Sequence, residues 1–423
     1  MDAAVAYSTL AMTVALAVSR PRVGSFGLRV TPGIAAVLGV FVLLSVGLLR
    51  VGDLAASARI QWRPLLALTC IMTMTGVVKE VGVFERLALR LEDLARSLST
   101  VQVFDVIFVA SVLTPSLLNN DAAILLLTPV VVTLAERLYP GNTKVLEGFA
   151  FAVFLAPGVA PLVISNPMNM IVAEFAHIDF NTYARIMAPI SLVGALLTYS
   201  VLRVYYRGVF TAKAARLAAR PVPAAHPGEP AALALLLAIF CAYPVMAACG
   251  GPIWAVAVVG AGGSLLVARR YGVASPRRIA SHVSVDILAF LWGVFLVVTG
   301  LRHVGLVDHL STFYRAWEGH AAGHLGVIGV TAALGAAIVD NHPMAILDLM
   351  ALGNGGHAKP LLAALVGCDI GPRLLPIGSL AGLLWMDLLR RRGVDIGIGR
   401  FVRLGTLVLI PTLFASLALL WFT

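Results

Sequence analysis

Long runs of apolar residues recur along the whole chain and are separated by short polar stretches. The runs are about 16 to 22 residues long, close to the ~20 residues that a helix needs to cross the hydrocarbon core of a bilayer. In lipid the backbone polar groups must pair within the segment, so each run is predicted to be a helix. Uninterrupted helices are expected at 3–19, 33–49, 64–80, 184–205, 231–249, 252–268, 284–300 and 401–422.

Two further apolar segments carry a polar interruption near their centres. In 101–136 the interruption is Asn119–Asp121, and in 322–352 it is Asp340–His342. Arms of about 16 residues reach only about 24 Å, short of a ~30 Å hydrocarbon core. Re-entrant hairpins with polar tips inside the membrane are therefore predicted. Two full spans joined by a short loop are the alternative.

Another two apolar segments are broken by proline and glycine. The segment 147–176 contains Pro157-Gly158, and 359–390 contains Gly371-Pro372. Proline cannot donate a backbone hydrogen bond, so neither segment is expected to form one regular helix. The ends of half-helices carry partial charges and unpaired backbone groups, which are ready ligands for ions or polar solutes.

The same order of segments occurs twice, which predicts an internal repeat. The first repeat is expected at 1–206 with its hairpin and broken helix, and the second at 231–423. An Ala/Pro-rich basic stretch, 207–230, reads as a cytoplasmic linker between them. Each repeat also has an amphipathic charged stretch, 82–98 or 302–320. If each repeat crosses the membrane five times, an odd number, the second repeat starts on the opposite side from the first. The repeats are then inverted with respect to each other. The predicted fold class is an all-α polytopic membrane protein.

Composition and charge agree with this interpretation. Hydrophobic residues make up 60% of the 423 and charged residues 12%, about half of the usual charged fraction. With the linker in the cytoplasm, 23 of the 31 lysines and arginines fall on the cytoplasmic side and 7 on the other. This excess follows the positive-inside rule and places both termini in the periplasm. The inner membrane of a prokaryote is the expected location, and the first helix is expected to be retained.

Several other function classes have little support in the sequence. The net charge of +10 is spread between apolar spans, and no nucleic-acid-binding motif occurs. The four cysteines have no metal-ligand spacing, so no zinc site or disulfide framework is indicated. A phosphate-binding GxxxxGK[ST] loop is missing, and no cofactor or metal is expected. Catalytic HExxH, GxSxG or paired-aspartate patterns are also missing, which leaves a membrane-embedded enzyme as a remote alternative.

The two hairpin tips are the first candidates for binding chemistry. Amides can coordinate a cation or bind a hydroxylated solute, while a carboxylate or an imidazole can carry a proton. Capping of the following helix is the structural alternative for each tip. Solute contact is assigned to Asn119, Asn120 and Asn341, and proton coupling to Asp121, His342 and Asp348.

The broken helices supply the remaining candidates. Asp369 is a further candidate for proton coupling, and its spacing from Arg373 would allow an ion pair if that segment is helical. Kinked helices that simply pack on their neighbours are the structural alternative. Solute contact is assigned here to Ser165, Asn166, Asn169, Gly378 and Ser379.

At two of these motifs the chain resembles the arsenical pump membrane protein (ArsB) family. The motifs are Asn119–Pro129 and Gly367–Ala381, and the resemblance extends loosely over nearly the whole chain. It implies export of trivalent arsenite and antimonite in exchange for protons, on an inverted-repeat fold with two re-entrant hairpins. Some members of the family also work with a soluble ATPase, so such a subunit is a candidate partner.

Secondary active efflux of arsenite and antimonite by alternating access around a midplane site is therefore the expected function. Within the same superfamily, a sodium/proton antiporter and a di- or tricarboxylate carrier are the alternatives. Protons and membrane lipid are the expected partners besides the solute, nucleic acid is not, and homo-oligomer formation stays open.

Overall fold

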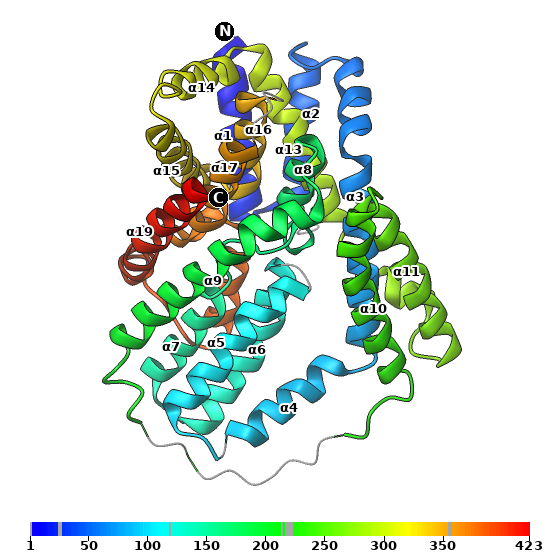
Figure 1. The fold of residues 1–423 in the computed structure, drawn as a ribbon, viewed down its shortest axis with the longest axis vertical. Helices are drawn as coiled ribbons and strands as arrows, with labels where there is room; N and C mark the ends of the chain where they lie inside the picture. Colours follow the sequence, from blue (N-terminus) through cyan, green and yellow to red (C-terminus); the bar gives the residue numbers. More distant parts are fainter. Residues whose placement is uncertain are drawn as a thin grey trace.

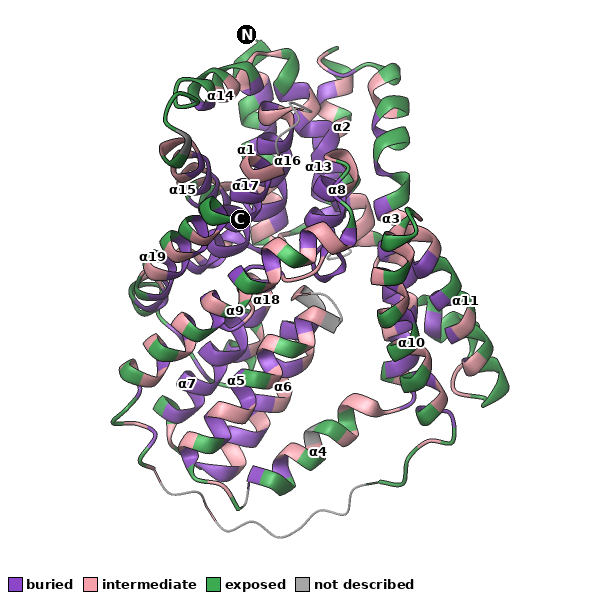
Figure 2. Cartoon of the chain, viewed as in Figure 1, coloured by how far each residue is buried: buried purple, intermediate pink, exposed green. Residues whose placement is uncertain are grey.

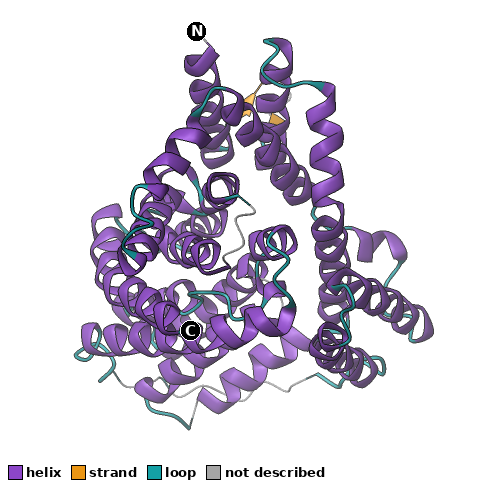
Figure 3. Ribbon diagram, turned by 45° about the horizontal axis from the view of Figure 1, so that its top comes forward, coloured by secondary structure: helices purple, strands orange, loops and turns teal. Residues whose placement is uncertain are grey.

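The computed structural model describes residues 2–23, 28–95, 97–117, 120–212, 215, 223–353 and 358–423. Helices dominate this part of the chain, and a single pair of two-residue strands joins the first two helices (Figure 3). Seven helices are long and apolar enough to cross a membrane, or eight if the bent pair α3 and α4 is one span. The prediction of an all-α polytopic membrane protein is confirmed.

In the first half of the chain, two helices occupy the segment expected to form a hairpin, and three shorter elements occupy the segment expected to be broken. The hairpin arms are α5 (Thr100–Leu117) and α6 (Asn120–Leu138). The broken segment comprises α7 (Thr143–Leu155), a short 3₁₀ turn, η1 (Val163–Ser165), and α8 (Pro167–Phe175). The other elements are α1 (Asp2–Ser19), β1 (Arg22–Val23), β2 (Leu28–Arg29), α2 (Pro32–Ser45), α3 (Val51–Glu80), α4 (Val83–Ala95) and α9 (Phe180–Tyr205).

The second half has the same succession. Its hairpin arms are α15 (Ala321–Val339) and α16 (Asn341–Leu352), and its broken segment runs from α17 (Ala358–Ile370) to α18 (Leu380–Arg391). Two 3₁₀ turns, η2 (Gly371–Arg373) and η3 (Pro376–Gly378), form that second break. The other helices are α10 (Glu229–Ala248), α11 (Ile253–Arg270), α12 (Pro276–Ala280), α13 (Val285–His303), α14 (Leu306–Arg315) and α19 (Ile398–Phe422).

One predicted boundary is wrong. Helix α3 begins at Val51 instead of residue 64, because its polar first turns are capped and held by side chains. The Asp53 carboxylate accepts a hydrogen bond from the Arg50 backbone N–H at 2.7 Å, and Trp292 Nε1 donates to Ser57 Oγ at 2.8 Å. Hydropathy alone misses such a start. The strand pair and the short helix α12 were also not predicted.

Helices from the two halves pack on one another in matching pairs. Helix α2 packs against α13 while α3 packs against α11, and α6 packs against α18 while α16 packs against α8. Helices α9 and α19 pack against each other. The amphipathic helices α4 and α14 lie near opposite ends of the long axis (Figure 1).

Two helices are buried along nearly their whole length, and both lead directly into a break. All residues of α7 from Val145 to Leu155 are buried, as are those of α17 from Leu361 to Ile370 (Figure 2). A helix that is apolar and buried on all sides can only end inside the protein if its terminal carbonyls find partners. For α7 this partner comes from the second break and belongs to the candidate site.

Candidate functional site

The two broken segments meet, and Asp369 joins them. This residue is 7% exposed and lies at the end of α17. Its carboxylate accepts hydrogen bonds from the Ala160 backbone N–H at 2.9 Å and from the Asn166 amide at 3.1 Å. Both donors belong to the first break. A buried carboxylate is tolerated only when it is hydrogen-bonded in this way.

Arg373 also reaches the first break from η2. Its Nη2 donates to the carbonyl oxygen of Leu155 at 2.5 Å and to that of Pro157 at 3.5 Å. Its Nη1 donates to Thr412 Oγ1 of α19 at 3.1 Å. The guanidinium therefore sits at the carboxyl end of α7, where the helix dipole is negative and a cation is stabilised.

Asp369 and Arg373, both in the described part of the chain, do not form the ion pair that their spacing would have allowed in a continuous helix. The segment Gly371–Arg373 is a 3₁₀ turn instead of a continued α-helix, so the i, i+4 geometry is lost. Each side chain contacts the opposite break instead. The pair balances one negative against one positive buried charge without direct contact.

Backbone approaches around Arg373 are too close for larger residues. A Cβ atom added at Gly158 would lie 2.8 Å from Arg373 Nη2, and one at Gly405 would lie 1.7 Å from the Arg373 carbonyl oxygen. Gly371 is equally constrained, because its Cβ would lie 2.3 Å from the carbonyl oxygen of Ala333 on α15. Glycine is the residue that permits such contacts.

Three of the predicted asparagines have buried amide atoms that form no hydrogen bond with any described residue. Asn169 is fully buried, and neither its Oδ1 nor its Nδ2 is hydrogen-bonded. The Oδ1 atoms of Asn120 and Asn341 are likewise without a partner there. Orphaned buried amides are rare in proteins and call for a water or a ligand.

A small cavity lies between the first hairpin and the first break. Its volume is about 10 Å³, which is room for one water-sized group. Asn120 and Ser165 line it together with Ser116 and Ser191, and Ser165 Oγ donates to the Ser116 carbonyl at 3.4 Å. These two predicted residues are thus neighbours in space.

The second hairpin tip turns at Asp340, whose backbone is unusual. Its φ of 78° and ψ of 149° lie in a region that is essentially reserved for glycine. The Asp340 carboxylate accepts from the His342 backbone N–H at 3.0 Å and lies 3.1 Å from His342 Nδ1. Asp340 therefore caps α16 and orients His342 at the same time.

Asp348 lies in a separate polar cluster. The Tyr314 hydroxyl of α14 donates to Asp348 Oδ1 at 2.6 Å, and Cys368 Sγ lies 3.8 Å from Oδ2. All three side chains are buried. The cluster joins α14, α16 and α17, and it includes neither of the described breaks.

The remaining predicted residues have structural contacts or lie outside the description. Ser379 Oγ accepts from the Gly382 N–H at 3.0 Å and caps α18. Gly378 packs on Pro372, whose Cα would lie 2.9 Å from an added Cβ. Asn119 lies outside the described residues, and for Asp121 only the backbone, in α6, is described.

Sequence reasoning missed several residues of the site. Tyr183 of α9 donates its hydroxyl to the Ala160 carbonyl at 3.2 Å and is fully buried. In the sequence, the only indication of this role was that Tyr183 places a tyrosine hydroxyl within an apolar segment. Ala160, Leu155 and Thr412 contribute backbone groups or a helix-face hydroxyl, for which no signal was available. Within the described residues no group of three or more metal-ligating side chains is assembled.

Comparison with known proteins assigns the chain to a family. The arsenical pump membrane protein family matches residues 5–422. The chain belongs to this family. An arsenical pump membrane protein of Escherichia coli is 29% identical over 424 residues, covering 97% of this chain and 96% of that protein. Membership makes the chain a membrane transporter and overrules the alternative of a membrane-embedded enzyme.

The chain is also similar to a mycobacterial transporter and to a transporter of known structure. An uncharacterized transporter of Mycobacterium tuberculosis is 28% identical over 383 residues, with 86% of each chain covered. The crystal structure of the Alcanivorax borkumensis YdaH transporter superposes with a TM-score of 0.57, covering 99% of this chain and 96% of that one. At 17% identity this second similarity supports the transporter fold alone. This chain and that transporter thus share a fold.

Proposed function

We propose that the chain exports trivalent arsenite and antimonite across the inner membrane in exchange for protons, by alternating access around the two breaks. The observation that carries the proposal is the bond between Asp369 and Asn166, which joins both breaks in one buried polar site. The relatives named as arsenical pumps, similar over nearly the whole chain, support the choice of solute.

The chemistry of the site suits an uncharged hydroxylated solute. Arsenite at neutral pH is a neutral trihydroxide, so its site needs hydrogen-bonding groups rather than a strong opposite charge. Asn169 offers both a donor and an acceptor without a partner in the described structure, and Asn120 and Asn341 each offer an acceptor. While Asp369 is deprotonated its charge balances that of Arg373, which supports a neutral cargo.

Coupling to protons requires a titrating group close to the solute. Asp369 fits this role because it is buried, bonded to both breaks, and carries no direct ion pair among the described side chains. Protonation would remove the charge that strengthens the hydrogen bonds from Ala160 and Asn166, and would so loosen the contact between the two breaks. Asp348, Asp121 and His342 remain secondary candidates.

We also propose that the halves are inverted repeats with re-entrant hairpins, joined by a cytoplasmic linker, with both termini in the periplasm. The matching contacts of α6 with α18 and of α16 with α8 support the repeat, as does the position of α4 and α14 at opposite ends. The charge asymmetry supports the orientation. A soluble ATPase subunit and a homo-oligomer are compatible with this arrangement.

Sodium/proton exchange is the second candidate function, because broken helices provide carbonyl ligands for cations in other transporters. Here the guanidinium of Arg373 already occupies the carbonyls of Leu155 and Pro157. The other alternative, a carboxylate carrier, would need a cation to bind its solute. Among the described residues of the two breaks, Arg373 is the one arginine or lysine. Its hydrogen bonds to protein oxygens leave little capacity for a carboxylate.

Uptake into everted membrane vesicles tests the proposal. Vesicles holding the chain are given arsenite, antimonite, Na⁺ or citrate under an imposed pH gradient, acid inside. Accumulation of arsenite and antimonite that collapses with the pH gradient is the expected result. Sodium-dependent pH changes that are insensitive to arsenite would instead select the antiporter, and citrate uptake would select the carboxylate carrier.

A further inference from the structure

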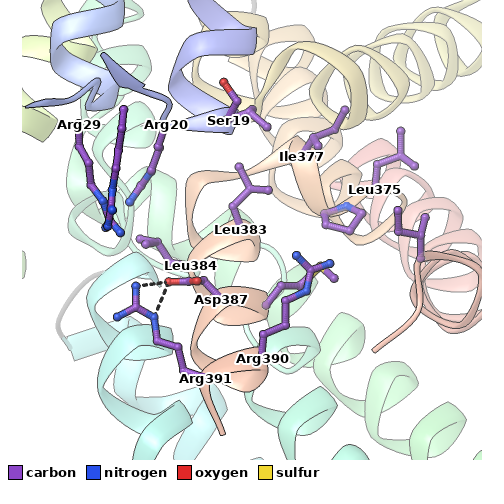
Figure 4. A pocket seen from close by; sticks show the side chains of 15 residues that line it. Ser19, Arg20, Arg29, Leu375, Ile377, Leu383, Leu384, Asp387, Arg390 and Arg391 are labelled. Atoms are coloured by element: carbon purple, nitrogen blue, oxygen red, sulfur yellow. Dashed lines mark hydrogen bonds and ion pairs between the residues drawn. The ribbon is translucent and has the colours of Figure 1, made fainter. Parts of the chain in front are cut away.

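A large basic pocket lies beside the second break and has no part in the site above. Its volume is about 570 Å³, and it opens between the end of α1, the β1–β2 pair and α18 (Figure 4). Arginines dominate its polar lining, with one carboxylate, Asp387, among them. The arginines are Arg20, Arg22, Arg29, Arg390 and Arg391.

The positive charge of this pocket is only partly neutralised by protein groups. Arg391 pairs with Asp387 at 2.8 Å, and Arg390 pairs with Asp395 at 3.6 Å. By contrast, Arg20, Arg22 and Arg29 form no ion pair within 4.0 Å with any described residue. The side chains of Arg20 and Arg29 point toward the space above Asp387 (Figure 4). Three cations therefore converge without a matching anion.

Arg20 carries the strongest indication that an anion is missing. Its Nε is buried and has no hydrogen-bond partner in the described structure. Burial lowers the pKa of the Arg20 guanidinium, and the attraction of Asp286 and Asp387 offsets this only in part. A guanidinium remains charged even so, and a partly buried charge without an ion pair is stabilised when a counter-ion joins it.

Apart from Ser19, the rest of the pocket wall is apolar. It includes Val18 at the end of α1, Leu383 and Leu384 on α18, and Leu375 and Ile377 at the second break. A free inorganic ion would gain nothing from such a wall. An amphiphile with an anionic head would contact both the arginines and the apolar residues.

We propose that this pocket binds the headgroup of an anionic phospholipid. Its phosphate diester accepts hydrogen bonds from Arg20, Arg22 and Arg29, and its acyl chains lie along the apolar wall. Arginine is suited to phosphate because its planar fork donates two parallel hydrogen bonds. Basic pockets between membrane helices on the cytoplasmic side bind such headgroups in other proteins.

A lipid bound in the pocket would contact the second break directly. Leu375, Pro376 and Ile377 line the pocket and also form or flank η3, which leads into α18. A bound headgroup therefore ties the second break to the β1–β2 pair. Anionic lipid thus stabilises the conformation in which this pocket exists.

Thermal unfolding of the purified chain in detergent tests the proposal. The probes are phosphatidylglycerol, phosphatidylcholine and inorganic phosphate, each added separately. The double variant Arg22→Gln/Arg29→Gln removes two pocket charges at exposed positions, so the fold is not compromised. The matched control is Arg269→Gln/Arg270→Gln, which removes the same charge from exposed positions on α11.

Phosphatidylglycerol is expected to raise Tm clearly more than phosphatidylcholine does. That difference should fall by at least half in the pocket variant and persist in the control, and native mass spectrometry should show retained lipid following the same order. An equal response of the pocket variant and the control would overturn the proposal. A full Tm shift with inorganic phosphate alone would overturn the assignment to a lipid in favour of a free oxyanion.

Discussion

Nη2 of Arg373 lies 2.5 Å from the carbonyl oxygen of Leu155, 218 residues earlier in the chain. This bond neutralises the carboxyl end of α7 with a fixed charge from the other half. The carbonyls that would otherwise bind a mobile cation are thereby occupied. Transport by this chain should therefore proceed without sodium.

Replacement of Arg373 by alanine should abolish this arrangement. Losing hydrogen bonds to a charged group costs about 1.5–3 kcal/mol, so Tm should fall and arsenite uptake should drop about tenfold or more. Added guanidinium ion should restore part of the uptake, because it can refill the vacated space. Arg59→Ala removes an exposed arginine and serves as the control in the same vesicle assay. Unchanged uptake in Arg373→Ala would contradict the assigned role.

Asp369→Asn should separate solute movement from proton coupling. The amide keeps the size of the carboxylate and can still accept from Ala160, but it cannot release a proton at physiological pH. Arsenite counterflow between two equal pools should persist, while accumulation driven by a pH gradient should be lost. The control is Asp395→Asn, at a side chain that is 79% exposed. Gradient-driven accumulation by Asp369→Asn would move the coupling role to another acid.

The breaks themselves could be predicted from sequence. Each break holds a proline, Pro157 or Pro372, which cannot donate a backbone hydrogen bond, and α7 and α17 end beside these prolines as expected. Asn166 and Asp369 were both predicted as site residues, although nothing in the sequence indicated that they bond to each other. Proline and glycine act through local backbone geometry, and local backbone geometry can be predicted from neighbouring residues in the sequence.

Contacts between distant segments could not be predicted. The donor to Asp369 is the backbone N–H of Ala160, and an alanine gives no sign of such a role. Arg373 was expected beside Asp369 from their spacing, but the 3₁₀ turn redirected its side chain to Leu155. The three unpaired arginines of the basic pocket were interpreted only as topology signals, because their convergence depends on tertiary packing.

Asp340 gives a prediction about strain. Its backbone conformation costs a non-glycine residue about 1–3 kcal/mol, and replacing a capping aspartate by glycine costs only a few tenths. Asp340→Gly should therefore match or exceed the wild-type Tm, whereas Asp340→Ala, which keeps the strain and loses the cap, should unfold earlier. Arsenite uptake should fall in both variants because His342 loses its contact with the Asp340 carboxylate. A fully active Asp340→Gly variant would show that the strained aspartate has no part in transport.

Two glycines of α19 provide a matched test of the packing around the second break. A Cβ at Gly405 would lie 1.7 Å from the Arg373 carbonyl oxygen, whereas a Cβ at Gly399 would meet nothing within 4 Å. Overpacking against backbone costs about 1–3 kcal/mol or more, while alanine in an exposed helix gains up to about 1 kcal/mol over glycine. Gly405→Ala should therefore lower Tm and reduce uptake, and Gly399→Ala should leave uptake unchanged and hold or raise Tm. Equal Tm values for the two variants would mean that α19 does not press on η2 as closely as described, and the position of Arg373 against Leu155 would then lose its main support.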